Sequence, residues 1–368
     1  MSGPGPQNPG ADPQTAEARK AESASALPEL LEDAAELEAA VAPGLLRRRL
    51  TETTTWTFLI LLGIVAGFTL VRPGQFATVF NFRNIAVDAS GLSILAVGMT
   101  FVIITAGIDL SVGSMLVFSG VIAAKVMLAV GGGGWGAIGA GAAAGLAAGL
   151  AWGIVNGVLI TKARVPPLIV TLGTLGMALG SALLITGGID VRGIPLQLTT
   201  TVGIGQLAGV PYVVLIAAVV TAVGAVVLGA TRFGRYTYAI GSNAEAARRA
   251  GIDVDRHLIK VYALSGLLAG LAGMVSLARF ATTTIGGHST DNLAAIAAVV
   301  LGGTSLFGGI GTVLGTVVGV FIPAVLQNGF VILGVQPFWQ QVAVGAVLIV
   351  AVYIDQLKRR AQERGERR

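Results

Sequence analysis

The sequence contains no cysteine and only two histidines, His257 and His288. The absence of cysteine excludes disulfide bonds, thiolate nucleophiles and cysteine-based metal sites. Two histidines are too few for a histidine cluster, so we predict no metal site. No nucleophile, base and metal ligand are grouped within the apolar segments, as an intramembrane enzyme would require. We therefore predict no catalytic residues and a chain that is not an enzyme.

Charged residues are also scarce. They make up 12% of the chain, against about 25% in soluble domains. Hydrophobic residues make up 54%, and the mean hydropathy is +0.80. This composition predicts a protein that crosses a membrane many times.

Glycine is abundant, with 53 residues, but no nucleotide-binding loop accompanies it. None of the lysines follows a glycine, so the GxxxxGK[ST] loop is absent; they are Lys20, Lys125, Lys162, Lys260 and Lys358. The GGTSLFGGIGT string from Gly302 lies between apolar segments, which is the wrong context for a dinucleotide fingerprint. We expect no cofactor to bind to this chain.

Apolar segments of membrane-spanning character fill most of the chain after residue 50. Nearly all approach the roughly twenty residues that cross a hydrocarbon core. They are Thr55–Val71, Ile85–Ala106, Ser111–Val130, Gly136–Ile160, Leu168–Thr186, Pro211–Ala230, Leu258–Arg279, Leu293–Gly303, Gly308–Leu326 and Phe338–Ile354. We count the short Leu293–Gly303 as a crossing that is lined by protein or water. The predicted fold is an all-α polytopic membrane bundle with about 10 transmembrane helices.

The two ends of the chain differ from this middle part. Residues 1–50 are rich in proline, alanine and glutamate, which predicts a disordered tail. Residues 51–355 form the predicted transmembrane domain, and residues 356–368 are a basic tail.

The basic residues predict the orientation of the bundle. With ten crossings and a cytoplasmic amino terminus, most Lys and Arg fall on the inside, as the positive-inside rule requires. Only five fall outside: Arg72, Arg83, Lys125, Arg192 and Arg279. We therefore predict a multi-pass protein of the cytoplasmic membrane with both termini in the cytoplasm. The net charge of +5 then reflects orientation, and we predict no nucleic-acid partner.

The loop at residues 231–257 is the main polar stretch between apolar segments, and it contains a short predicted helix. Ser242 is the expected N-cap, with Glu245 closing a capping box. Gly251 followed by Ile252 predicts a Schellman-type end. So short a helix is marginal by itself, and its non-polar face is made of alanines: Ala246, Ala247 and Ala250. We expect this face to dock on another protein, although a solvated connector is the simpler alternative.

Few polar residues occur within the apolar segments. Asp109, in the string GIDLSVGS, is either the N-cap of the next helix or a carboxylate that lines a permeation path at a broken helix. Asp88 is a weaker candidate of the same kind, and His288 is interpreted as a loop residue. The candidate pathway residues are Asp109, Ser111, Asn156 and Thr171, of which the last two are also typical of helix–helix contacts. So few ionisable groups argue against an ion-coupled carrier.

Glycines recur every four residues along two segments: Gly141, Gly145, Gly149, Gly153 and Gly157, and then Gly311, Gly315 and Gly319. Small residues at this spacing allow helices to pack closely in lipid. The functional alternative is that these seams are surfaces that slide during transport.

Several motifs together resemble a known family. They are GIDLSVGS (107–114), the Asn156–Gly157 pair, PPLIVTLGTLGMALG (166–180), GRYTYAIGSNAEAARRAGI (234–252) and AAIAAVVLGGTSLFGGIGT (294–312). Their order and spacing, over about residues 85–355, closely resemble the permease subunits of ABC importers for ribose, xylose, arabinose, galactose and related sugars.

The resemblance implies partners and a site. Two permease subunits would pair, as a homodimer or a heterodimer, two ATPase subunits would bind the ATP, and an extracytoplasmic sugar-binding protein would deliver a monosaccharide. The loop helix would be the coupling helix that the ATPase grips; its residues are Ser242, Asn243, Glu245, Ala246, Ala247, Arg248, Arg249 and Gly251.

The sequence departs from the family in two places. Asn292 stands where the family typically has glutamate, and the tail before Arg47 is not part of the family's core. Relatives in the wider group carry branched-chain amino acids or nucleosides, and a stand-alone secondary carrier is a further alternative.

Overall fold

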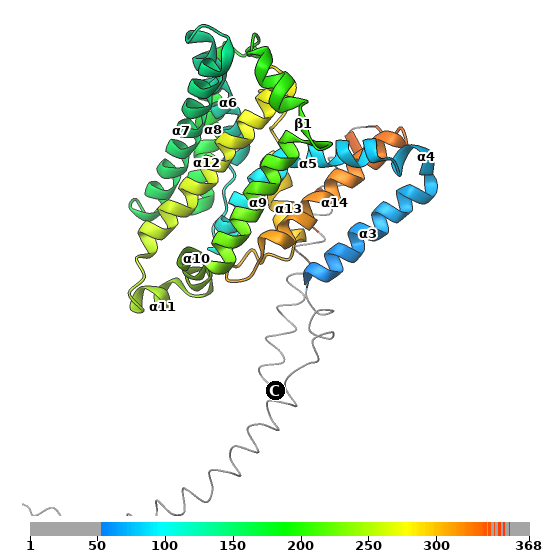
Figure 1. Cartoon of the computed structure of the whole chain (residues 1–368). Helices are drawn as coiled ribbons and strands as arrows, with labels where there is room; N and C mark the ends of the chain where they lie inside the picture. Colours follow the sequence, from blue (N-terminus) through cyan, green and yellow to red (C-terminus); the bar gives the residue numbers. More distant parts are fainter. Residues whose placement is uncertain are drawn as a thin grey trace, which may run out of the picture. The chain divides into compact units, whose positions relative to one another are not determined.

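The computed structural model describes residues 53–336 together with residues 338, 339, 342, 345, 346, 349 and 353 (Figure 1). The predicted tails at residues 1–50 and 356–368 lie outside the described residues. So does most of the last predicted segment, Phe338–Ile354.

The described part is mostly helical. Its α-helices are α3 (Thr53–Val71), α4 (Pro73–Phe76), α5 (Val79–Ile104), α6 (Val112–Ala129), α7 (Gly134–Thr161), α8 (Pro167–Thr186), α9 (Tyr212–Ala230), α10 (Arg232–Ser242), α11 (Ala244–Arg249), α12 (Val254–Phe280), α13 (Asp291–Leu301) and α14 (Val313–Ile332). A π-helix, η1 (Leu198–Gly203), and an antiparallel pair of two-residue strands, β1 (Gln206–Leu207) and β2 (Val210–Pro211), connect α8 to α9.

Within the described residues, seven helices are long and apolar enough to cross a membrane: α5, α6, α7, α8, α9, α12 and α14. The apolar helices α3 and α13 are shorter. The prediction of a helical polytopic membrane protein is thus confirmed, whereas seven of the predicted ten or so crossings are found in this part of the chain.

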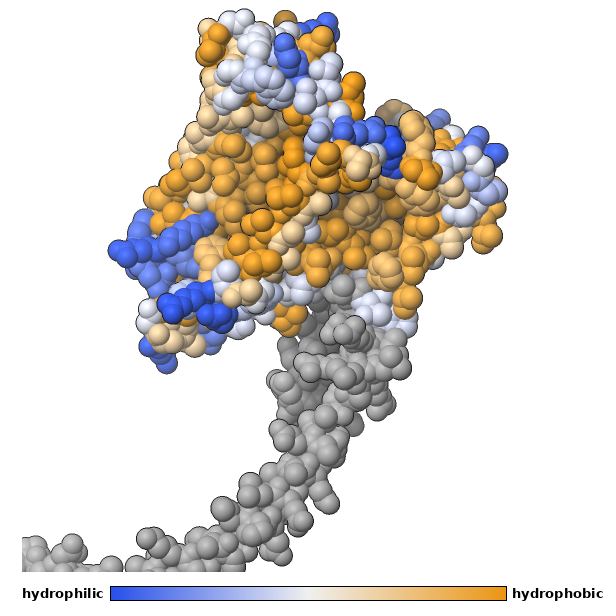
Figure 2. All heavy atoms as spheres, in the orientation of Figure 1, coloured by the Kyte–Doolittle hydropathy of each residue, from blue (hydrophilic) through white to orange (hydrophobic). Residues whose placement is uncertain are grey.

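The surface has the character expected of a protein in lipid. Figure 2 shows a broad apolar band across the visible face of the bundle, with hydrophilic residues gathered toward its ends, most densely over α10 and α11. Large apolar side chains of α8 and α9 are exposed, among them Leu172, Leu184 and Val219. An exposed apolar surface of this extent is stable only against lipid or a partner.

Helices α5 and α12 form the centre of the bundle. Both are mostly buried, and α12 packs against α5, α6 and α7. The glycine seam of α7 makes the last of these contacts very close: a Cβ added at Gly157 would lie 2.7 Å from the Cα of Ile259 in α12. Gly319 approaches Ala298 of α13 in the same way. The two seams therefore pack helices against each other, as predicted; the alternative of sliding surfaces stays a prediction.

The chain is non-helical between the end of α5 at Ile104 and the start of α6 at Val112. This stretch begins at the end of the bundle that carries α10, because the amide of Gly309 and the Cα of Gly241 both meet the carbonyl of Ile104. It then returns into the interior, where Asp109 is completely buried. Irregular backbone at this depth must find internal hydrogen bonds, and these lead to the first candidate site.

Candidate functional site

The non-helical stretch is held by buried polar side chains, which we call the interior polar cluster. Its members are Asp109, Ser111, Asn156, Thr171, Thr174 and Ser265. One carboxylate oxygen of Asp109 accepts hydrogen bonds from the amide and hydroxyl of Ser111 at 3.0 and 2.5 Å. The other oxygen accepts from the hydroxyl of Ser265 in α12 at 3.0 Å. Asp109 therefore joins the start of α6 to the middle of α12.

Asn156 extends these bonds to α7 and α8. Its amide nitrogen donates to the Ser111 hydroxyl at 2.9 Å, and its carbonyl oxygen accepts from the Thr174 hydroxyl at 2.7 Å. Thr171, one turn earlier in α8, donates to the carbonyl of Ile108 at 3.2 Å. The four predicted pathway residues thus meet around one stretch of backbone.

The geometry shows which residue caps α6, but it does not test whether the cluster takes part in translocation. Ser111, and not Asp109, is the N-cap residue of α6, and it makes no side-chain cap bond; the N-cap interpretation of Asp109 is wrong because the helix begins three residues later. Asp109, Ser111, Asn156 and Thr171 are all fully buried. In this structure they connect helices and do not line an open passage. Their role in translocation stays a prediction.

The second candidate site is the polar loop, which contains two helices instead of one. Ser242 is the last residue of α10 and not the N-cap of α11. Asn243 is the N-cap: its backbone is extended, and its side-chain oxygen accepts from the amide of Ala246 at 2.9 Å. Glu245 closes no capping box and instead pairs with Arg249 at 3.5 Å. The predicted cap was one residue early because α10 continues through Ser242.

The other end of α11 is as predicted. Gly251 has a φ of 84°, which favours glycine. Its amide donates to the carbonyl of Arg248 at 2.9 Å, and the amide of Ile252 donates to the carbonyl of Ala247 at 3.0 Å. This is the Schellman pattern.

One alanine of the non-polar face of α11 is buried in the protein, and the other two are exposed. Ala247 is buried against Ile240 of α10 and Val254 of α12. The expectation that the alanine face docks on another protein is therefore wrong for Ala247, which packs this six-residue helix against its own protein. The other residues assigned to coupling are exposed: Ser242, Asn243, Glu245, Ala246, Arg248, Arg249 and Gly251.

Helix α10 holds α11 against the bundle. The hydroxyl of Tyr238 donates to the carbonyl of Gly311 at 2.7 Å, and the hydroxyl of Thr237 is 2.9 Å from Nε2 of His257 in α12. Gly241 contacts the backbone of Ile104 so closely that a Cβ would collide with it. The glycine-rich string at 302–312 is thus a packing surface for α10.

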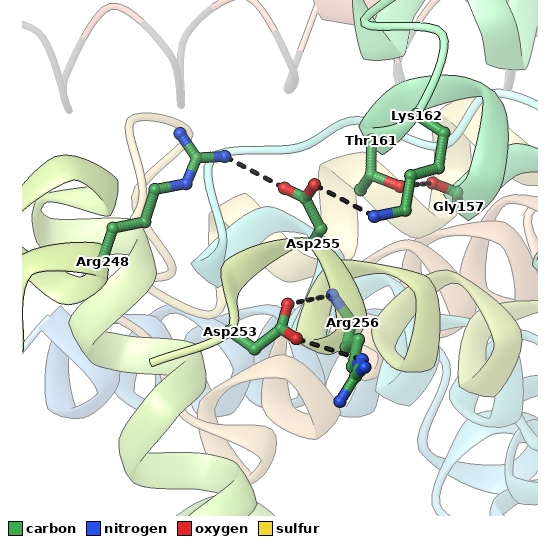
Figure 3. Close-up of polar contacts among 7 residues, drawn as sticks. All are labelled: Gly157, Thr161, Lys162, Arg248, Asp253, Asp255 and Arg256. Carbon is green, nitrogen blue, oxygen red and sulfur yellow. Dashed lines mark hydrogen bonds and ion pairs between the residues drawn. The ribbon is translucent and has the colours of Figure 1, made fainter. Parts of the chain in front are cut away.

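Asp255 joins α11 to two membrane helices, as Figure 3 shows. One carboxylate oxygen accepts from Arg248 of α11 at 3.0 Å, and the other lies 3.4 Å from Nζ of Lys162 at the end of α7. Asp253 separately caps α12 through the amide of Arg256, with which its side chain also pairs. No sequence pattern predicts the link between Asp255 and Lys162, because the two residues are 93 positions apart.

A cavity of about 850 Å³ lies beside this link. It lies between the end of α7, the end of α11 and the start of α12, and its polar lining includes Thr161, Arg164 and Asp255. The exposed face of α11 and this cavity together offer a partner protein both a projecting helix and a hollow.

Comparison with known proteins identifies the family. Residues 81–352 match the family described as "Branched-chain amino acid transport system / permease component". The chain is similar to the ribose import permease protein RbsC of Escherichia coli K12, with 41% identity over 312 residues that cover 82% of this chain and 93% of that protein. It is also similar to the fructose import permease protein FrcC of Rhizobium meliloti, with 34% identity over 81% of this chain and 83% of that protein.

A third relative is the probable ABC transporter permease protein y4mJ of Sinorhizobium fredii, which is 35% identical over 88% of this chain and 96% of its own length. No solved structure matches the chain. The match covers nearly all described helices, including both candidate sites, and it places the protein among transport components and not among enzymes. The chain, a multi-pass membrane protein by its apolar helices, belongs to the branched-chain amino acid transport system permease component family.

Proposed function

We propose that this chain is the permease subunit of an ABC importer that moves a monosaccharide inward across the cytoplasmic membrane. The observation that carries the proposal is the similarity, over four fifths of the chain, to permeases named for the import of ribose and of fructose. The absence of a nucleotide-binding loop from the sequence agrees with a subunit whose ATP is bound by a partner.

In this proposal α11 is the coupling helix. Its exposed residues contact the ATPase subunit, while the Ala247 contact and the Schellman end hold it on the bundle. A displacement of α11 reaches α7 and α12 through Arg248, Asp255 and Lys162. Rigid-body shifts of packed helices are a common form of switching, and the spans would change the side to which they open.

The proposed topology has ten crossings. They are the seven long helices, α3, α13 and the segment Phe338–Ile354. This count puts both termini, α10 and α11 in the cytoplasm, in agreement with the positive-inside rule. The partners are two ATPase subunits, a second permease subunit, an extracytoplasmic sugar-binding protein and the surrounding lipid.

The proposal is tested by co-purification and uptake. Ala246→Arg changes the exposed face of α11 without touching Ala247, so we expect the ATPase subunit to be lost and ATP-dependent sugar uptake to fall to background. Arg256→Ala is the matched control, because Arg256 is exposed and makes only a local ion pair in α12. An ATPase that stays bound to the Ala246→Arg protein with normal uptake would contradict the proposal.

The family description names amino acid transport, so the cargo needs its own test. Uptake by the assembled complex is measured for D-ribose, D-fructose, L-leucine and adenosine. We expect uptake of a monosaccharide, and uptake of L-leucine or adenosine alone would reassign the cargo. Flux through the purified chain in liposomes without any ATPase would instead identify a stand-alone carrier.

A further inference from the structure

A second cavity, of about 530 Å³, opens in the half of the bundle remote from α11. Its wall includes residues 87–92 of α5, 272–280 of α12, 290–301 near and in α13, and 322–330 of α14. Helix α12 starts beside α11 at Val254 and reaches this cavity only in its last third. The volume lies within the roughly 300–1,000 Å³ of small-molecule sites.

Most of the cavity wall is apolar, and two groups of polar side chains interrupt it. The first is an ion pair between Asp88 of α5 and Arg279 of α12. The Arg279 guanidinium also lies 5.0 Å from the centre of the Phe280 ring. These contacts fix the guanidinium plane at the cavity wall, where N–H groups beyond those used by Asp88 can donate.

The second polar group is a chain of three side chains. Nδ1 of His288 is 2.8 Å from a carboxylate oxygen of Asp291, and Nε2 is 2.9 Å from the hydroxyl of Ser276. Both ring nitrogens are therefore engaged, and the His288 side chain is only 15% exposed. His288 lies in the loop between α12 and α13, as its sequence context predicts, and its ring is a fixed part of the cavity wall.

Fixed polar groups in an apolar cavity are typical of ligand sites. From these contacts we infer that this cavity is the site at which the permease holds its cargo, a neutral polyhydroxyl ligand such as a monosaccharide. The inference rests on the proposed function.

The wall favours a neutral ligand over a charged one. The Asp88 carboxylate is paired with the Arg279 guanidinium, and the Asp291 carboxylate is bonded to the His288 ring, so each of these groups already has a partner in the cavity wall. A zwitterionic amino acid would have to break the pair of Asp88 and Arg279 to be bound. Sugar hydroxyls can instead use the remaining carboxylate lone pairs and guanidinium N–H groups, while the apolar wall packs against the C–H faces of the ring.

A thiol-labelling experiment tests this site directly. The chain has no native cysteine, so Ala294→Cys places a single thiol in the cavity wall. In the assembled complex we expect the monosaccharide that the wild type imports to slow its labelling several-fold, and L-leucine to leave the rate unchanged. Leu207→Cys, exposed in β1 and outside the cavity, is the control whose rate neither ligand changes. Slowing at both positions, at neither, or by L-leucine would overturn the inference.

A steric test gives a second measurement. Gly91 lines the cavity, and a Cβ added there meets nothing within 4 Å, so Gly91→Phe fills the space without a clash at the backbone. We expect uptake to fall to background while the ATPase still co-purifies. Gly176→Phe, on an exposed and equally open position of α8, is expected to keep wild-type uptake.

The two proposals can fail separately. A wild-type complex that imports no monosaccharide contradicts the proposed function. A wild-type complex that imports one, together with a Gly91→Phe complex that imports it equally well, contradicts only the assignment of this cavity.

Discussion

Asn156 is the residue on which the interior polar cluster depends most. Its amide group uses both ends, one toward Ser111 at the start of α6 and the other toward Thr174 of α8. In lipid no water replaces a lost partner, although hydrogen bonds between membrane helices are measured at only about 0.6–2 kcal/mol each. A single amide can therefore decide how three helices meet without dominating the total stability.

We expect Asn156→Leu to lower stability by about 1–2 kcal/mol, because the change keeps the volume but removes two hydrogen bonds. Ser111 can still donate to Asp109, and Thr174 to the carbonyl of Val170, so a larger loss is not expected. The measurement is the thermal midpoint of the purified protein in detergent. Ser119→Ala is the control, because no partner of the Ser119 hydroxyl is found among the described residues. Equal shifts for both variants would contradict the role of Asn156.

Residue chemistry explains how far the sequence could predict this cluster. Asp109 and Asn156 stand out as polar side chains in apolar segments, so their importance is visible without a structure. Thr174 and Ser265 were missed because a helical hydroxyl can bond its own preceding turn, as Thr174 also does with Val170. Only the fold shows that Ser265 faces Asp109, 156 positions away.

At the scale of elements, the contact between α7 and α12 is the most extensive between two helices of the described residues. Gly149, Gly153 and Gly157 of α7 each face backbone atoms of α12. Glycines at every fourth position predict a close helix–helix contact, but they do not predict which helix packs against them. The partner is known from the fold alone, because α12 follows α7 by nearly a hundred residues.

We expect Gly153→Ala to destabilise the protein by about 1–3 kcal/mol, since its methyl group would overlap the backbone of Tyr262 and lie 2.9 Å from the Cα of Ala263. Gly139→Ala is the matched control in the same helix, where a Cβ meets nothing within 4 Å. Alanine favours helix by about 1 kcal/mol over glycine, so the control is expected to be neutral or stabilising in the same thermal measurement. A stable Gly153→Ala protein would show that the seam opens easily, as the sliding alternative requires.

The polar loop shows why helix boundaries were harder to predict than helices. Ser242 and Asn243 are both good N-cap residues, and a local rule cannot choose between them. The choice is made by α10, which continues through Ser242 because Gly241 packs on the backbone of Ile104. The Schellman end needs only Gly251 and the apolar residue after it, so it was predicted correctly.

Asp255 gives a prediction about transmission between elements. Exposed ion pairs contribute about 0–1 kcal/mol, so Asp255→Asn is expected to leave the thermal midpoint nearly unchanged. The same change releases α11 from α7, and under the proposed function sugar-stimulated ATP hydrolysis should fall more than basal hydrolysis. Arg256→Ala, which breaks only a pair within α12, should leave the stimulation intact. Full stimulation in Asp255→Asn would exclude this ion pair from coupling.

At the scale of the whole molecule, the polar features divide between two ends of one apolar band. The exposed face of α11 and its neighbouring cavity lie at one end, and the polar wall of the cargo cavity lies toward the other. Helix α12 runs from Asp255 through Ser265 of the interior polar cluster to Ser276 and Arg279 of the cargo cavity. One central helix thus contacts the coupling site, the interior cluster and the cavity, which is the arrangement that a transmitted shift needs.

This division predicts that the two ends face opposite sides of the membrane. The absence of native cysteine allows single thiols at Ser242, the exposed last residue of α10, and at Leu207, exposed in the strand pair near the other end. We expect a membrane-impermeant thiol reagent to label Leu207→Cys in intact cells, and Ser242→Cys only after the membrane is permeabilised. An ATPase in the cytoplasm reaches α11 only in this orientation. Labelling of Ser242→Cys in intact cells would place α11 outside and remove the physical basis for coupling.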